Sequence, residues 1–199
     1  MSHLHSETGS PLRLPLIAPA DLTPAQKAVY DEMRRGVARH FNAFRAERKD
    51  GALMGPWNPW LHEPAIGKAI WDLTLTMTAN AVLPDNVRQI AILVVGARYD
   101  AAYEIYAHIA VAEREGMSPE RLATLVADVK PSDLTRDESI AYDVAYALTR
   151  GGTLPEPLYR LAVATFSQHG ANELFYLVGL YALVSTTLNA FNVPVPERE

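Results

Sequence analysis

Residues 86–119 read NVRQIAILVVGARYDAAYEIYAHIAVAEREGMSP and give the clearest indication of the fold. No strand-like alternation of apolar and polar residues is sustained in it, and the pattern predicts helices over residues 86–98 and 101–115. Gly116 is suited to end the second helix, and Ser118 followed by Pro119 is suited to start another. The first of the two helices is strongly apolar, so we expect the two to pack as an antiparallel hairpin.

Helical signals continue on both sides of this stretch. Thr23, Pro24 and Gln26 form a capping-box pattern that predicts a helix running to about Ala46. A second capping box, TRDE, opens another at Thr135. The remaining helices are expected at about residues 65–80, from 118 onward, from 155 or 157 to near 170, and at 172–191. The sequence therefore predicts an all-α, single-domain bundle of about eight helices over residues 23–199.

Two segments lie outside this helical pattern. Residues 1–22 are rich in Pro, Leu and Ser, and we expect an extended N-terminal arm, of which the first ten residues could equally be a disordered tail. Residues 55–64, GPWNPWLHEP, hold two Trp and three Pro, which predicts a rigid loop with aromatic anchors and no regular helix.

Composition excludes several functions. The net charge of −5 disfavours nucleic acid and anionic membrane surfaces as partners. The apolar run at residues 174–188 is shorter than the roughly 20 residues of a membrane span. The N-terminus does not resemble a signal peptide, so we expect a cytoplasmic protein. The chain has no cysteine, which excludes thiol nucleophiles and thiolate metal sites.

The best candidate for chemistry is the pair Glu104 and His108. Four residues apart on one predicted helix, they lie on the same face about one turn apart. A carboxylate beside an imidazole can act as a general acid, a general base or a pair of metal ligands. The alternative is an ordinary pair on a solvated helix face. Tyr103, Tyr106 and Ala107 crowd the same helix and favour a sheltered position.

Three motifs together resemble a known family. The runs RQIAIL, YEIYAH and EGMSPE, in this order and spacing, resemble the carboxymuconolactone decarboxylase and alkylhydroperoxidase D-like family. Its typical forms are an Arg-Glu-Leu-Ala helix, a Tyr-Glu-Trp with His four residues after the Glu, and a Gly-Leu-Ser turn. The Gly-Pro-Trp segment and the tail LNAFNVPVP look like the larger, cysteine-free members. The resemblance covers roughly residues 56–196.

The resemblance implies a helical fold that assembles as a homotrimer or homohexamer. In the peroxidase members, a Cys-x-x-Cys pair occupies the positions of Ala101 and Glu104, and the family's histidine corresponds to His108. Both thiols are absent here, so thiol peroxidase activity is excluded. The chain also has Gln89 where many members have Glu, and a glutamine cannot relay a proton at neutral pH.

The resemblance implies, and these residues are compatible with, a cofactor-free decarboxylase or lyase that acts on a carboxylated lactone or an aromatic-derived small molecule. Arg88 or Arg98 would hold a carboxylate, and His108, oriented by Glu104, would supply a proton. Trp57 and Tyr103 would line the substrate-binding cavity and exclude water.

Two alternatives remain open. The chain could be a non-catalytic binding or assembly protein that kept the fold. A metalloprotein using His108 is less favoured, because one His and one Glu supply only two ligands, and we predict no metal site.

Overall fold

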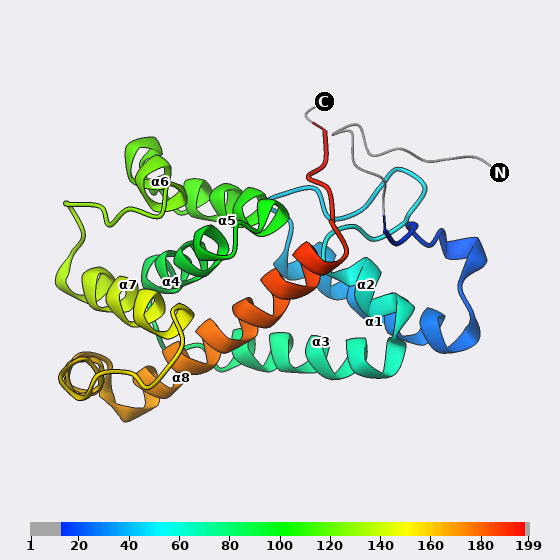
Figure 1. Ribbon diagram of the computed structural model, residues 1–199. Coiled ribbons are helices and arrows are strands. Elements are labelled where there is room, and N and C mark those ends of the chain that lie inside the picture. The colour runs from blue at the N-terminus through cyan, green and yellow to red at the C-terminus, as the bar shows by residue number, and fades with distance from the viewer. Residues whose placement is uncertain (1–12, 198–199) are drawn as a thin grey trace. The chain divides into compact units, whose positions relative to one another are not determined.

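The computed structural model describes residues 13–197. Within this range the chain is helical and contains no β-strand, only an isolated bridge between Glu47 and Leu53 (Figure 1). The prediction of an all-α fold with about eight helices is confirmed. The elements are a 3₁₀ helix at Pro19–Asp21 and the helices α1 (Pro24–His40), α2 (Trp57–His62), α3 (Pro64–Ala79), α4 (Asp85–Arg98), α5 (Ala102–Arg114), α6 (Pro119–Val126), α7 (Arg136–Thr149) and α8 (Glu156–Ala190).

The predicted helix starts are formed by the side chains that signalled them. Thr23 caps α1 and Thr135 caps α7, each in a reciprocal capping box with the residue three positions later. Ser118 caps α6 by accepting a hydrogen bond from the Arg121 backbone. Of the predicted N-terminal arm, residues 1–12 lie outside the described range. From Arg13 the chain shows no regular structure before the 3₁₀ helix at Pro19–Asp21.

The end of the first helix was predicted wrongly. Helix α1 ends at His40 and not near Ala46, because Phe41 has non-helical dihedral angles. The chain beyond it makes other hydrogen bonds: Met54 N–H donates to the carbonyl of Ala46, and Arg48 N–H donates to that of Ala52. The backbone of residues 46–54 is therefore paired as a turn and is not available to prolong the helix.

The prediction of a loop at residues 55–64 was also wrong, because the segment holds the short helix α2. Pro59 is only the third residue of that helix, and in the first turn a missing N–H breaks no intrahelical hydrogen bond. Trp60 N–H then donates to the carbonyl of Pro56. The aromatic anchors are present as expected, since Trp57 and Trp60 are both buried.

The two last predicted helices are joined in α8. A single residue with non-helical angles, Ser167, interrupts it at φ 61° and ψ 172°, three residues before the expected break at Gly170. Gly170 has a packing role, because a Cβ there would lie 2.9 Å from the Cβ of Phe166. Helix α8 is long and apolar enough to cross a membrane. Half of its most apolar 18-residue stretch is buried in the protein, and core helices of proteins outside membranes meet the same criteria of length and hydropathy.

The chain divides into two compact units. Unit 1 runs to Thr76 and includes the chain from Thr187 onward, whereas unit 2 is residues 77–186. In unit 1, the Trp71 ring takes the space above Gly36, where a Cβ would lie 2.3 Å from the indole. A glycine that weakens α1 as a helix thus permits close packing of α1 on α3.

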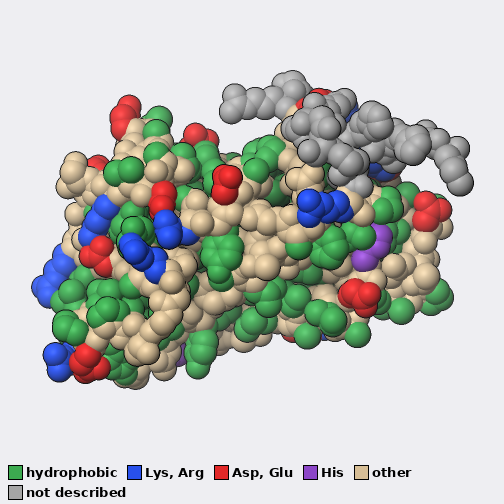
Figure 2. Space-filling view, viewed as in Figure 1, with side chains coloured by type: hydrophobic (Ala, Val, Ile, Leu, Met, Phe, Trp, Pro, Cys, Tyr) green, Lys and Arg blue, Asp and Glu red, His purple; other side chains and the backbone are tan. Residues whose placement is uncertain are grey.

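Unit 2 is built around α4. This helix is buried from Val87 to Gly96 and contacts α5, α6 and α7. Its neighbours contribute buried residues such as Leu122, Leu125 and Val144 to one core. On the outside of unit 2, basic and acidic side chains are interspersed (Figure 2), with pairs such as Lys130–Asp143. Because α4 is enclosed by its neighbours, its two buried polar side chains, Arg88 and Gln89, are held in fixed positions.

Candidate functional site

A tight connection between α4 and α5 brings the candidate residues together. Asp100 adopts a left-handed conformation with φ 49°, and Ala101 N–H donates to the carbonyl of Gly96 at 2.9 Å. The side chain of Glu104 then passes over Gly96, where a Cβ would be 3.5 Å from the Glu104 Cγ. The predicted helical hairpin is therefore formed, with the Glu104–His108 face of α5 turned toward α4.

Glu104 and His108 are sheltered from water. They are 3% and 7% exposed, which rejects the alternative of a solvated helix face. His108 Nε2 lies 3.1 Å from Glu104 Oε1. Within the described range, that oxygen nevertheless accepts no hydrogen bond of acceptable geometry. The pair is at ion-pair distance, but the carboxylate keeps an acceptor site that a substrate proton could use.

Gln89 of α4 binds the other side of the imidazole. Its Oε1 lies 2.8 Å from His108 Nδ1, and both groups are buried. With the amide oxygen facing the ring, a His108 that carries a proton on Nδ1 donates a hydrogen bond to Gln89. In neutral His108, Nε2 is then the unprotonated nitrogen and faces Glu104.

Tyr181 of α8 covers the imidazole. Its ring meets that of His108 edge to face, with centroids 5.0 Å apart and planes at 89°. Burial raises the pKa of Tyr181 above its usual value, and the negative charge of Glu104 raises it further. The phenol therefore remains protonated at ordinary pH and can donate a hydrogen bond.

Arg88 has a buried carboxylate partner of its own. Its guanidinium forms an ion pair with Glu173 Oε1, and both side chains are at least about nine-tenths buried. The other oxygen, Oε2, accepts hydrogen bonds from the backbone of Val82 and Leu83 at 2.7 and 2.9 Å. The predicted substrate cation is thus already neutralised, and a substrate carboxylate would have to share it with Glu173.

Arg98 lies at the other end of α4. Its Nη1 donates to Asp128 Oδ2 at 2.6 Å, and its guanidinium lies over the Tyr146 ring, 5.1 Å from the centroid. The hydrogen bond to Asp128 raises the pKa of Arg98. Its described contacts are thus with α7 and the segment after α6, and it is not among the contacts of the His108 cluster.

The two predicted aromatic residues lie in different units. Tyr103 belongs to unit 2, is 1% exposed and contacts the Tyr106 ring edge to face; burial raises its pKa well above the usual value. Trp57 belongs to unit 1, where it stacks on Phe44 with ring centroids 6.2 Å apart and also contacts Phe41. That Trp57 lines the substrate site stays a prediction.

Glu173, Gln89 and Tyr181 were not predicted from the sequence as partners of the candidate residues. A signal existed for Glu173, the single charged residue in residues 171–190, because an isolated charge on an apolar helix needs a partner. Gln89 was noted only as a departure from a family pattern. As for metals, the described residues contain no group of three His, Asp or Glu that could hold an ion.

Comparisons with known proteins agree with the fold. No family model and no curated protein sequence matches the chain. The alkylhydroperoxidase AhpD core of an uncharacterized peroxidase-related protein from Ralstonia eutropha JMP134 matches with a TM-score of 0.74 and 14% identity, over 94% of this chain and 93% of that one. A cysteine-to-alanine variant of the debrominase Bmp8, in complex with 2,3,4-tribromopyrrole, matches with a TM-score of 0.68 and 12% identity, over 98% and 94%. The chain has the AhpD-like fold.

Proposed function

We propose that this protein is a cofactor-free acid–base enzyme of the lyase type, in which His108 exchanges a proton with a small organic substrate. One observation carries the proposal: the buried Glu104 carboxylate lies 3.1 Å from His108 Nε2 and retains an oxygen without a hydrogen bond. A buried polar atom without a partner is costly to keep. Such atoms are expected where a ligand completes the hydrogen bonding.

The three neighbours of the imidazole have separate tasks. Gln89 holds the proton on Nδ1, so that Nε2 is the nitrogen that gives or takes the proton. Glu104 stabilises the imidazolium when Nε2 is protonated. The protonated Tyr181 phenol is suited to donate to an oxygen that becomes negative during the reaction.

A decarboxylation uses these groups without a cofactor if the substrate can hold the electron pair. The bond to the carboxylate carbon breaks, carbon dioxide leaves, and the pair remains as an enolate or dienolate. His108 Nε2–H then protonates the carbanionic carbon, and solvent restores the proton. The absence of cysteine argues against thiol peroxidase chemistry.

The test is His108→Ala, assayed against carboxylated lactones and aromatic-derived acids by release of carbon dioxide and incorporation of solvent deuterium. We expect turnover to fall by about 10²- to 10⁴-fold while helicity is unchanged. His169→Ala, an exposed histidine of α8, is the matched control and should match the parent. Equal turnover of His108→Ala and parent would remove His108 from the mechanism and favour a non-catalytic binding protein.

A further inference from the structure

Ser185 is a buried residue of α8 whose hydroxyl makes no hydrogen bond. Its side chain is fully buried, and its Oγ has no partner among the residues that the structure describes. It lies on the buried face of α8, which is otherwise apolar around it, with Leu177, Val178 and Val184. A hydroxyl enclosed in apolar surroundings without a hydrogen bond costs free energy. Packing alone would be served as well by an alanine.

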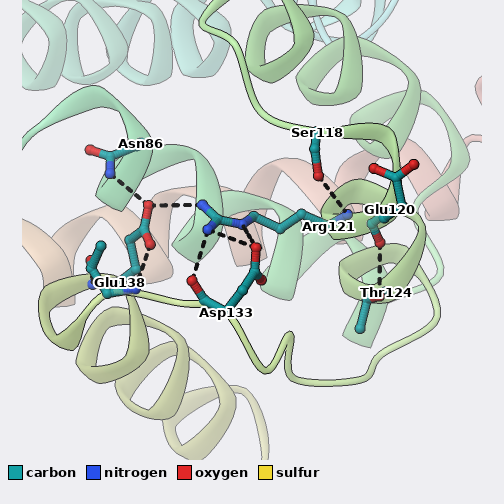
Figure 3. A network of polar contacts seen from close by, with 8 residues as sticks. Asn86, Ser118, Glu120, Arg121, Thr124, Asp133 and Glu138 are labelled. Atoms are coloured by element: carbon teal, nitrogen blue, oxygen red, sulfur yellow. Dashed lines mark hydrogen bonds and ion pairs between the residues drawn. The ribbon is translucent and has the colours of Figure 1, made fainter.

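Other helical hydroxyls of unit 2 bond to their own helix. Figure 3 shows the Thr124 hydroxyl donating to the carbonyl of Glu120, four residues earlier, at 2.8 Å. Thr186, the residue after Ser185, likewise donates to the carbonyl of Ala182 at 2.8 Å. A serine in a helix can make this same bond. Ser185 does not, so its hydroxyl remains available to a group outside α8.

The network around Glu138 shows a buried polar group whose bonding is complete. One oxygen of Glu138 accepts from Asn86 at 2.7 Å and from Arg121 at 3.2 Å (Figure 3). The other oxygen accepts from the Thr135 backbone at 2.8 Å. These bonds join α4, α6 and α7 without any ligand. Ser185 differs from this pattern and resembles Glu104, whose Oε1 is also buried and unbonded.

Ser185 lies one helical turn from the residue that covers His108. It follows Tyr181 by four residues in the part of α8 after Ser167, so the two side chains share a face, with Cβ atoms about 5–6 Å apart. The Tyr181 ring contacts His108 edge to face. On α5, Glu104 also lies one turn from His108. The two unbonded oxygens therefore belong to residues that each lie one turn from the Tyr181–His108 contact.

Charged groups act on the other side of Tyr181. Burial raises the pKa of Tyr181, the charge of Glu104 raises it further and that of Arg88 opposes this, so both charges are near the phenol. Arg88 is paired with Glu173, about two turns before Tyr181 on α8, whereas Ser185 is one turn after it. A substrate carboxylate is thus favoured on the Arg88 side. An uncharged hydroxyl such as that of Ser185 is suited to donate to an uncharged oxygen.

We propose that Ser185 is a specificity-determining residue, whose hydroxyl donates a hydrogen bond to an uncharged oxygen of the substrate, such as the carbonyl oxygen of a carboxylated lactone. The carboxylate of the same molecule lies toward Arg88, with the Tyr181–His108 contact between the two ends. The identity of this ligand as substrate rests on the proposed function, whereas the binding preference does not. A molecule without the uncharged oxygen binds less well, because it leaves the buried hydroxyl unbonded.

The test compares two monoanions of similar size, the carboxylate of γ-carboxy-γ-butyrolactone and cyclopentanecarboxylate, which lacks the lactone oxygens. Each is titrated into the full chain, and binding is followed by the ¹⁵N signals of the His108 ring. We expect the parent to bind the lactone about fivefold more tightly and Ser185→Ala to bind both probes equally, because a neutral hydrogen bond contributes a factor of this order. Thr186→Val removes the adjacent hydroxyl, which bonds to α8 itself, and should keep the preference.

A hydroxyl without a partner should also be dispensable for folding. Ser185→Ala should unfold at the same urea concentration as the parent or at a higher one, and a lower midpoint would reveal a structural role and overturn the proposal. Equal affinity of the parent for both probes, or no shift of the His108 ring by either probe, would overturn it as well.

Turnover separates this proposal from the proposed function. If His108→Ala retains full turnover while Ser185→Ala loses the lactone preference, the proposed function fails and the binding role of Ser185 stands. If His108→Ala loses turnover while Ser185→Ala keeps the lactone preference, the binding role fails and the proposed function stands.

Discussion

Arg88–Glu173 and Glu104–His108 are two buried pairs of unit 2, and they differ in how many hydrogen bonds the carboxylate oxygens accept. Glu173 uses both oxygens, one on Arg88 and one on two backbone N–H groups. Glu104 Oε1 lies 3.1 Å from His108 Nε2 but accepts no hydrogen bond of acceptable geometry. The first pair ties the start of α4 to α8 and to the chain before α4. The second places a carboxylate oxygen that accepts no hydrogen bond beside a buried imidazole.

The largest effect should come from the fully bonded pair. Glu173→Gln leaves the Arg88 charge buried without its counter-ion, so the free energy of unfolding should fall by about 3–5 kcal/mol. Urea denaturation of parent and variant measures this difference in the free energy of unfolding. Glu156→Gln, at the exposed start of α8, is the control and should change stability by less than about 0.5 kcal/mol. Equal losses in the two variants would show that Glu173 is not a structural anchor.

An intermediate effect is expected at Gln89. Gln89→Leu removes the acceptor of His108 Nδ1, and the unsatisfied N–H should cost about 1–3 kcal/mol. Nitrogen NMR of the His108 ring should show a proton on Nδ1 in the parent and a shift toward Nε2 in the variant. A parent ring already protonated on Nε2 alone would contradict the assigned role of Gln89. Gln168→Leu, at an exposed amide of α8, is the matched control.

The smallest effect on stability should come from Glu104→Gln, although its effect on turnover should be large. A buried oxygen without a hydrogen bond is costly to keep, and relief of this cost offsets the lost attraction to His108, so the free energy of unfolding should change by less than about 1 kcal/mol in either direction. Turnover should drop about 10²-fold, because the imidazolium loses its counter-charge. A stability loss as large as that of Glu173→Gln would show that Glu104, like Glu173, is a structural anchor.

The sequence predicted what depends on residues close together in the chain. The capping boxes at Thr23 and Thr135 and the Glu104–His108 spacing involve partners three or four residues apart, and all three formed as expected. The end of α1 and the break in α8 were misplaced. The backbone pairing of residues 46–54 and the conformation of Ser167 carry no comparable local signal.

The partners of the site residues were harder to predict because they lie far away in the sequence. Gln89 and His108 are 19 residues apart, and Arg88 and Glu173 are 85 apart. A helical pattern shows which face of each helix is apolar, but not which polar residues of two helices meet. Arg88 was assigned to a substrate carboxylate for this reason, because no local pattern shows that Glu173 of α8 forms an ion pair with it.

The carboxylate at position 104 has a practical consequence for handling the protein. A site made of carboxylate, imidazole, amide and phenol contains no sulfur atom, and the chain has no cysteine elsewhere. Alkylating reagents such as N-ethylmaleimide have no thiol to modify, and reducing agents have no disulfide to open. An assay can therefore be run in air, with or without dithiothreitol, and any sensitivity to thiol reagents in a preparation would point to a contaminating enzyme.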